Sequence, residues 1–408
     1  MATSAYIHIP FCRRRCYYCD FAISVVGDRA RGDTSNTISQ YIDTLIQEIR
    51  ATPIASDKPL QTVFFGGGTP SLLSAAQLNE LLSALHIRFG IAPTAEISME
   101  MDPATFELPD IEGYQAAGIN RVSLGAQAFQ DDILAACGRF HRSQDIFRAV
   151  ELLQQAQINN FSLDLISGLP HQTLAHWQSS LEKAVALAPT HLSHYDLIVE
   201  PQTAFGRYFT PGEAPLPSDE HTARMYRVAQ AFLSAQGYEH YEICNYAKPD
   251  YEARHNLTYW HSQPCYGFGM GATSYINHQR IERPRTQRTY REWVERFIRQ
   301  KGRTPDPVLP PAEQVIEGIM VGLRLKQGIS LEAIYQMYGE RGLAQMEQAL
   351  APHLQAQRVI IDAPLLDREN ITKLEPTSRI RLSDPEGFLM SNQVIVDAFN
   401  ALEALRNR

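Results

Sequence analysis

Predicted strands and helices alternate through the first half of the chain, and this alternation limits the possible folds more than any other feature. Apolar runs of strand length are followed by segments whose apolar residues recur at helical spacing. The expected strands are Tyr6–Ile9, Thr62–Phe65, Glu96–Met101, Arg121–Gly125, Phe161–Ile166 and His191–Val199. Such alternation is typical of an α/β fold with a parallel sheet of right-handed crossover units. Six strands are too few for a closed eight-stranded barrel, so we expect a partial (β/α)6 barrel.

Helices are expected between these strands, and Ser74 can cap the one that follows it. They are Tyr41–Arg50, Ala75–Phe89, Ile111–Ala117, Leu174–Ala186 and further helices across 131–156. Beyond Pro201 the regularity changes. The later elements expected are helices Asp219–Gln236 and Thr289–Gln300 and one strand, Tyr241–Tyr246.

The C-terminal part begins after a proline-rich linker, Thr304–Pro311. Helices there surround two short strands, which predicts a small α+β domain of winged-helix-like type. The expected elements are helices Glu313–Leu323, Leu331–Tyr338, Ala344–Leu354 and Asn392–Leu405, with strands Val359–Ile361 and Arg379–Leu382. We therefore predict three parts: a barrel over 1–235, a barrel extension over 236–303 and a C-terminal domain over 312–408.

Composition excludes several classes of protein. Hydrophobic residues make up 44% of the 408 residues and charged residues 20%, as in ordinary soluble proteins. The net charge of −8 offers no general basic surface for nucleic acid, and the Arg13–Arg15 run is a local exception. No segment approaches the roughly 20 apolar residues of a membrane helix, and no signal peptide is expected. We expect a cytoplasmic protein that is not integral to a membrane.

Cys12, Cys16 and Cys19 form the clearest candidate metal site. Closely spaced thiolates suit an iron–sulfur cluster or zinc. Structural zinc sites usually have four ligands, whereas three cysteines without an obvious fourth leave a position open for another ligand. The alternative is a chance group of buried thiols. The other three cysteines are widely spread, which argues against a disulfide framework.

Polar residues and glycines occur where the predicted strands end, which is where α/β barrels carry their chemistry. Gly66–Pro70 follows the second strand; it suits either a tight turn or close approach of a ligand to the backbone. Glu100, Gln127 and Asp164 lie in or after the next strands. Buried acids need partners, so they either form salt bridges inside the barrel or accept hydrogen bonds from a ligand such as a ribose.

The C-x3-C-x2-C spacing and these strand ends resemble the radical S-adenosylmethionine superfamily. Within this superfamily, the chain resembles the coproporphyrinogen III dehydrogenase family. Four segments carry that resemblance: Tyr6–Cys12, Gly66–Pro70, Gly125–Gln127 and Asp164–Pro170. It implies a partial barrel, a 4Fe–4S cluster on the three cysteines and S-adenosylmethionine at the open iron. The residues that it places at S-adenosylmethionine are Tyr6, Tyr18, Gly67, Gly68, Thr69, Glu100, Gln127, Arg139 and Asp164.

The family contains an oxygen-independent oxidase and a group of haem chaperones. Phe21 stands where the oxidase has a further cysteine, and only eleven residues precede Cys12, where the oxidase has a long extension. His255–Trp260 matches the H-N-x-x-Y-W motif of the chaperone group. We therefore favour a haem chaperone and keep the oxidase, which decarboxylates porphyrin propionates, as the alternative.

The chaperone interpretation implies haem as cargo near His255, Tyr259 and Trp260. We favour His255 as the iron ligand, because neutral imidazole is a usual ligand of haem. Tyr259 or Cys265 is the next candidate. An acceptor protein and an electron donor such as flavodoxin or ferredoxin are implied partners. The sequence assigns no catalytic residue and does not identify the acceptor.

Overall fold

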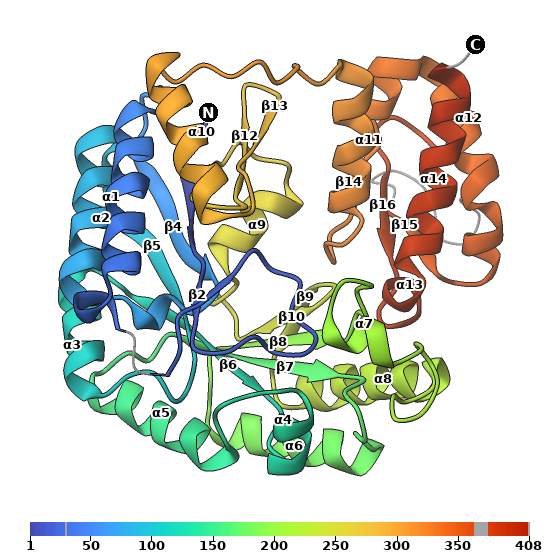
Figure 1. The fold of residues 1–408 in the computed structure, drawn as a ribbon. Coiled ribbons are helices and arrows are strands. Elements are labelled where there is room, and N and C mark those ends of the chain that lie inside the picture. The colour runs from blue at the N-terminus through green and yellow to red at the C-terminus, as the bar shows by residue number, and fades with distance from the viewer. Residues whose placement is uncertain (29–30, 363–373, 407–408) are drawn as a thin grey trace.

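Six parallel strands form the centre of the molecule, and helices cover the outer face of their sheet (Figure 1). The computed structural model describes residues 1–28, 31–362 and 374–406. The strands are β1 (Ser4–Ile9), β4 (Leu60–Gly67), β5 (Ile91–Met101), β6 (Arg121–Gln127), β7 (Phe161–Ser167) and β8 (His191–Asp196). The helices are α1 (Asn36–Ala51), α2 (Ala75–Phe89), α3 (Leu108–Ala117), α4 (Asp131–Ala136), α5 (Ser143–Gln155), α6 (Leu174–Ala186), α7 (Ala204–Tyr208) and α8 (Asp219–Ala235). The predicted partial barrel is confirmed.

The sheet is wider than six strands, because segments from beyond residue 235 extend both of its edges. At one edge β11 (Tyr266–Phe268) pairs in parallel with β1, with Tyr6 opposite Gly267. At the other edge β10 (Asn245–Ala247) pairs antiparallel with β8, and β9 (Glu239–Glu242) pairs with β10. The order of the nine strands is β11-β1-β4-β5-β6-β7-β8-β10-β9.

Two strand predictions are wrong in extent. The expected single strand Tyr241–Tyr246 is a hairpin, β9 and β10, because Ile243 and Cys244 form a turn between them. The Asn245 side chain donates to the Glu242 carboxylate across this turn. The strand expected over His191–Val199 ends earlier, at Asp196.

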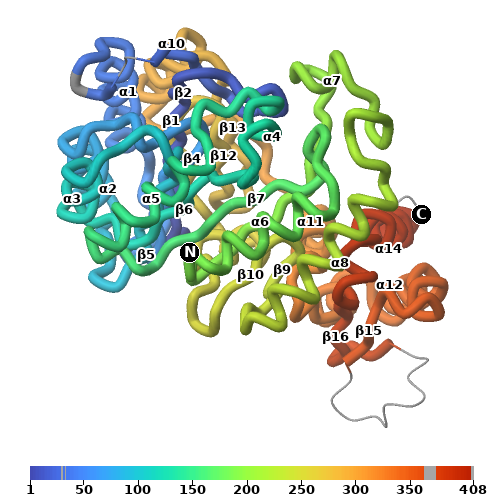
Figure 2. Tube along the Cα trace, turned by 90° about the horizontal axis from the view of Figure 1, so that it is seen from below, coloured from blue at the N-terminus to red at the C-terminus, as the bar shows by residue number. Residues whose placement is uncertain are grey.

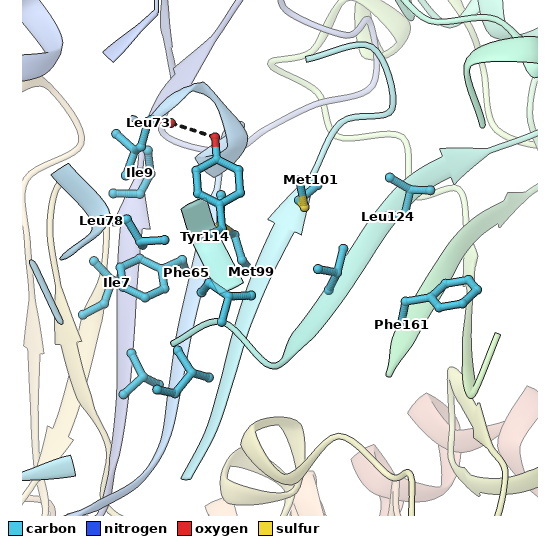
Figure 3. Close-up of a cluster of buried hydrophobic side chains, with 14 of the residues drawn as sticks. Ile7, Ile9, Phe65, Leu73, Leu78, Met99, Met101, Tyr114, Leu124 and Phe161 are labelled. Carbon is cyan, nitrogen blue, oxygen red and sulfur yellow. Dashed lines mark hydrogen bonds between the residues drawn. The ribbon is translucent and has the colours of Figure 1, made fainter. Parts of the chain in front are cut away.

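The apolar core lies between the sheet and the outer helices, where side chains from β1, β4, β5, β6 and β7 meet residues of the helices (Figure 3). Ile7, Phe65 and Met99 are fully buried on neighbouring strands. Tyr114 of α3 is also buried, and its hydroxyl donates to the carbonyl oxygen of Leu73 at 2.7 Å. The predicted cap of α2 is confirmed, because Ser74 Oγ accepts from Gln77 N at 3.3 Å.

The segment after β10 is joined to the barrel by a buried ion pair. It contains α9 (Arg254–Trp260), β12 (Thr273–Ile276), β13 (Gln279–Glu282) and α10 (Gln287–Arg299). The fully buried Glu48 of α1 accepts from Arg283 Nε at 2.7 Å, Tyr290 Oη at 2.5 Å and Gly269 N at 2.9 Å. Because each of these partners of Glu48 lies beyond residue 260, this segment completes the barrel wall.

A smaller α+β unit follows (Figure 2). Its residues form a second apolar core, which Tyr226 of α8 joins. It contains α11 (Pro311–Gly322), α12 (Glu332–Gln355), α13 (Glu386–Leu389), α14 (Ser391–Arg406) and the sheet β14 (Ile329–Ser330), β16 (Arg379–Leu382), β15 (Val359–Asp362). The helices expected over Leu331–Tyr338 and Ala344–Leu354 are the two halves of α12, which bends at Gly339. The Arg227–Glu386 ion pair connects the unit to α8, and His240 Nδ1 of β9 lies 3.0 Å from Asp384 Oδ1. The boundaries at 236 and 312 stay predictions.

No helix among the described residues combines the length and the apolar character needed to cross a membrane.

Candidate functional site

The three cysteines lie on a loop that leaves β1 at the carboxyl end of the sheet. Two short strands, β2 (Phe11–Cys12) and β3 (Ser24–Val25), pair with each other and close the loop. The guanidinium of Arg15 donates to the carbonyl oxygens of Cys19 at 3.2 Å and Ile23 at 3.4 Å, so it braces the loop. All three thiols are partly buried and none forms a disulfide.

The glycines after β4 hold this loop against the sheet. Gly68 N donates to the carbonyl oxygen of Ile9 at 2.8 Å, and Thr69 N donates to that of Phe11 at 2.7 Å. A Cβ atom on Gly68 would lie only 2.7 Å from Phe11 O and 3.0 Å from Cys12 Sγ. Gly67 has φ +112°, a conformation that favours glycine. The glycine run therefore permits close contact between the end of β4 and the cysteine loop.

Hydrogen-bond donors already face two of the thiols. Thr69 Oγ1 lies 3.6 Å from Cys12 Sγ, and Arg139 Nη1 lies 3.6 Å from Cys16 Sγ. Burial raises the pKa of the Cys12 thiol to about 12, while the Thr69 hydroxyl opposes that rise. The Cys12 thiol keeps its proton until a metal displaces it, and the Thr69 donor favours its thiolate.

Arg139 is held by Asp102, a residue that the sequence did not single out as a ligand contact. Arg139 Nη2 lies 2.7 Å from Asp102 Oδ2 and donates to the Gly125 carbonyl oxygen at 2.9 Å. Burial alone raises the pKa of Asp102, but Arg139 and His141 outweigh it and bring that pKa below its usual value. The carboxylate therefore stays charged and fixes the guanidinium beside Cys16.

Glu100 and Asp164 face the interior of the barrel from β5 and β7. Glu100 Oε2 accepts from Gly67 N at 2.9 Å, and burial raises the pKa of Glu100 to about 7. Both oxygens of Asp164 accept from Ser123 Oγ at 2.9 Å, and one accepts from Ser162 Oγ at 3.2 Å. Burial raises the pKa of Asp164, and the serine hydroxyls oppose that rise. These serines were not predicted, because a single serine in a strand carries no signal.

Several of the predicted site residues line one cavity of about 160 Å³ inside the barrel. Tyr6, Glu100, Asp164 and Tyr259 are among its walls, and Tyr195 of β8 joins them. His255 lines the cavity as well. The other residues predicted to contact S-adenosylmethionine lie around the cysteine loop or at the strand ends nearby. Tyr18 packs on Phe205 with ring centroids 6.3 Å apart, and Gln127 ends β6 with φ 64°.

The H-N-x-x-Y-W segment forms α9, which lies against β4. His255 is buried; its Nδ1 lies 2.8 Å from Thr62 Oγ1, and its Nε2 lies 2.9 Å from Tyr259 Oη. Its ring also stacks on Phe64 at 5.2 Å. Tyr259 keeps 41% of its surface exposed. Trp260 does not lie with His255 and Tyr259, because its side chain is beside Glu242. Burial raises the pKa of Glu242 to about 7, and Trp260 opposes that rise.

These residues fit a 4Fe–4S cluster with S-adenosylmethionine. Within the described ranges, no three His, Cys, Asp or Glu side chains are placed to hold one metal ion. A 4Fe–4S cluster does not require that arrangement, because each cysteine ligates a different iron. The buried carboxylates of Glu100 and Asp164 suit a cationic ligand that carries hydroxyl groups.

Comparison with known proteins identifies the family of this chain. The sequence profile of the radical SAM superfamily matches residues 6–184. Fold and site together define a radical S-adenosylmethionine protein. The heme chaperone HemW of Synechocystis sp. is 45% identical over 406 residues, which cover 99% of this chain and 98% of that protein. HemW of Bacillus subtilis is 37% identical over 82% of this chain and 87% of its own. The chain therefore belongs to the HemW family.

A solved structure shows the same fold. Coproporphyrinogen III oxidase, HemN, from Escherichia coli superposes with a TM-score of 0.79 and 24% identity, over 98% of this chain and 90% of that one. At this identity the likeness concerns the fold alone.

Proposed function

We propose that this protein is a cytoplasmic haem chaperone, which binds haem and passes it to an acceptor protein while it carries a 4Fe–4S cluster and S-adenosylmethionine. The observation that carries the proposal is similarity to HemW of Synechocystis sp. along 99% of the chain, so that barrel, extension and C-terminal unit are all shared. The cysteine loop, the glycine run and the buried acids support the two cofactors.

Different residues of the site would hold the two cofactors. Cys12, Cys16 and Cys19 would hold the cluster, with Thr69 and Arg139 donating to two of the sulfurs. Glu100 and Asp164 would attract the cationic groups of S-adenosylmethionine and accept from its hydroxyls. When bound and reduced, such a cluster supplies the electron that cleaves a carbon–sulfur bond of S-adenosylmethionine.

The contacts of α9 bear on how haem would bind. His255, the ligand favoured from sequence, is buried and has a partner on each ring nitrogen. Tyr259 is exposed, and phenolate is an established haem ligand. Its oxygen lies 2.9 Å from His255 Nε2, which can accept a hydrogen bond from the phenol. Burial lowers the pKa of His255 to about 3 and raises the pKa of Tyr259, so iron would have to displace the phenol proton. We propose that Tyr259 binds the iron and that His255 supports it.

The barrel cavity cannot enclose a porphyrin, because about 160 Å³ is below the roughly 300–1,000 Å³ of usual ligand pockets. Haem would therefore bind at the opening of the cavity, with the ring outside and the iron at Tyr259.

Two assays on the anaerobically reconstituted protein test the function. Haemin titration should give saturable binding with a shifted Soret band. Incubation with coproporphyrinogen III, reductant and S-adenosylmethionine should form no protoporphyrinogen IX above the cluster-free control. Turnover without haem binding would instead establish the oxidase, whose extra cysteine is replaced here by Phe21.

A further inference from the structure

A guanidinium without a carboxylate partner, that of Arg121, lies inside the barrel. Arg121 and Arg283 are the two buried arginines among the residues that the structure describes, and each is 4% exposed. Arg283 has a carboxylate partner, Glu48, at 2.7 Å. Arg121 forms no ion pair within the described ranges; its Nη1 donates to Asn160 Oδ1 at 3.0 Å and to the carbonyl oxygen of Tyr251 at 3.1 Å. A buried charge without a counter-charge is costly, so Arg121 is a candidate group for binding an anion.

A second donor lies beside Arg121 without a partner. Arg121 lines the cavity of about 160 Å³ that Tyr259 also lines. Ser98 lines this cavity too and lies opposite Arg121 where β5 pairs with β6. Ser98 is 2% exposed, and its Oγ has no hydrogen-bond partner in the described part of the chain. Buried hydroxyl groups normally have a partner, so an unpartnered one at a cavity indicates a ligand atom that it would bind.

The carboxylates of the same cavity do not use these donors. Both oxygens of Asp164 accept from Ser123 Oγ at 2.9 Å, and Glu100 accepts from Gly67 N. Arg121 acts on Asp164 through its charge, which opposes the rise in the pKa of Asp164. The cavity therefore has an acidic region, which we assign above to S-adenosylmethionine, and a donor region at Arg121 that suits a carboxylate.

The donor region lies beside α9, the helix that carries the proposed haem ligand. Arg121 bonds the carbonyl oxygen of Tyr251, two residues before Ala253, where α9 is capped. Ala253, Asn256 and Tyr259 line the cavity together with Arg121. Haem carries two propionates at one edge of its ring. The cavity is too small for the ring, but its 160 Å³ equals the volume of roughly five water molecules, which is enough for one propionate arm.

We propose that Arg121 and Ser98 bind one propionate of haem inside the cavity, while the other propionate stays in solvent. The inference rests on the haem binding proposed above and adds the residues that recognise the cargo. Such a site favours porphyrins with a free carboxylate, because an esterified propionate would leave the guanidinium of Arg121 without a counter-charge. The carboxylate of S-adenosylmethionine has the same chemistry, but the position of Arg121 beside α9 favours haem.

The test compares haemin with haemin dimethyl ester, which keeps the ring and the iron but lacks both carboxylates. Each porphyrin is titrated into the full-length reconstituted protein, and the Soret band is followed. The variants are Arg121→Gln and Ser98→Ala. The matched control is Arg254→Gln, because Arg254 is an exposed arginine of α9 that does not line the cavity and bonds the carbonyl oxygen of Thr94.

We expect the wild type to bind haemin at least about tenfold more tightly than the ester, as the loss of a charged hydrogen bond implies. Arg121→Gln should lower haemin affinity by a similar factor and leave ester affinity unchanged. Ser98→Ala should lower haemin affinity about twofold to tenfold. Arg254→Gln should match the wild type with both porphyrins. Equal affinity of the wild type for haemin and ester would overturn the proposal, and so would an equal loss of both in Arg121→Gln.

Ser98→Ala keeps the test decisive if Arg121→Gln does not fold, because the Ser98 hydroxyl has no described protein partner to lose. A preference for haemin over the ester that Ser98→Ala leaves unchanged would then overturn the proposal. Calorimetry should show unchanged S-adenosylmethionine binding in both variants.

Two other outcomes have distinct meanings. Loss of S-adenosylmethionine binding in the variants, with wild-type affinity for haemin, would assign Arg121 to the carboxylate of that cofactor and overturn the proposal. No haemin binding in the wild type would refute the chaperone proposal itself, whereas haemin binding without preference over the ester refutes this inference alone.

Discussion

The hydroxyl oxygen of Tyr259 lies 2.9 Å from Nε2 of the buried His255, so one hydrogen bond joins an exposed side chain to a buried one. The pair gives the H-N-x-x-Y-W segment a defined division of roles. The partly exposed phenol could contact a ligand, and the imidazole stays neutral, because burial lowers its pKa to about 3, and can accept a hydrogen bond from the phenol.

The first prediction concerns this pair. Tyr259→Phe keeps the ring and removes the oxygen, so it should lower haemin affinity at least about tenfold, or about 1.4 kcal/mol, and change the Soret band. His255→Gln should weaken binding less and keep the band near that of the wild type. Absorbance titration of both variants is the measurement. The reverse ranking would return the ligand role to His255, and unchanged binding in both would place haem elsewhere.

A second prediction concerns the cluster. Replacement of Cys12, Cys16 or Cys19 by Ala should abolish cluster absorbance near 400 nm, an approximate region, and remove bound iron and sulfide. Cys244→Ser is the matched control, because Cys244 is a free cysteine of similar exposure outside the loop. Iron and sulfide analysis after reconstitution gives the result. Full iron content in the triple variant would exclude these ligands.

Asp164 and its serine partner make a third prediction. Asp164→Asn should weaken S-adenosylmethionine binding by about 1–3 kcal/mol, because a charged hydrogen-bond acceptor is lost. Ser123→Ala removes a donor to both Asp164 oxygens and should raise the pKa of Asp164 further. Binding by Ser123→Ala should therefore be weak near pH 6 and recover as the pH rises. Calorimetry at both ends of that range distinguishes this pattern from a uniform loss caused by structural damage.

The fourth prediction is a pH dependence set by Glu100. Its pKa of about 7 leaves the carboxyl mostly neutral at pH 6 and mostly charged at pH 7.5. Because S-adenosylmethionine carries positive groups, binding should strengthen up to about eightfold over this interval, the rise in the ionised fraction. Glu100→Gln should bind more weakly at pH 7.5 and flatten the profile. A wild-type profile that falls with pH has the wrong sign for this mechanism.

The fifth prediction tests the ion pair that completes the barrel. Glu48→Gln leaves the guanidinium of Arg283 buried without its counter-charge and should lower the free energy of unfolding by about 3–5 kcal/mol. Arg288→Gln is the control, since its pair with Glu292 is exposed and contributes about 0.3–0.5 kcal/mol. Urea unfolding of the two variants gives the comparison. Equal losses would show that the buried pair does not stabilise the barrel wall.

The sequence predicted the elements whose signals are local. Each of the six strands between Tyr6 and Asp196 contains an apolar run that is long enough to identify. The Ser74 cap depends only on its own side chain and the first turn of the helix that follows. The cysteine loop and glycine run were found as motifs, and the structure places Gly68 against Cys12. Parallel strands end at the same edge of a sheet, so the sequence also predicted that Glu100 and Asp164 lie on nearby strands of the barrel.

Relationships across large distances in the chain could not be predicted in this way. β11 has three residues, too few for a periodic signal, and pairs with a strand near the N-terminus. Glu48 looks like any acid on an amphipathic helix until Arg283 and Tyr290 are brought to it. His255 was chosen for its chemistry, whereas its burial depends on packing against Phe64 and Thr62.

During synthesis, the strand that pairs with the outer edge of β1 is made long after β1 itself. β1 begins at Ser4, but the strand that covers its free edge, β11, lies at Tyr266–Phe268. Chains begin to fold from the N-terminus as they leave the ribosome, and an uncovered strand edge can pair with the wrong chain. A nascent chain that stalls before β11 should therefore aggregate, and early folding should depend on cellular chaperones. A protein proposed to carry haem therefore keeps an unpaired strand edge until its last barrel strand has been made.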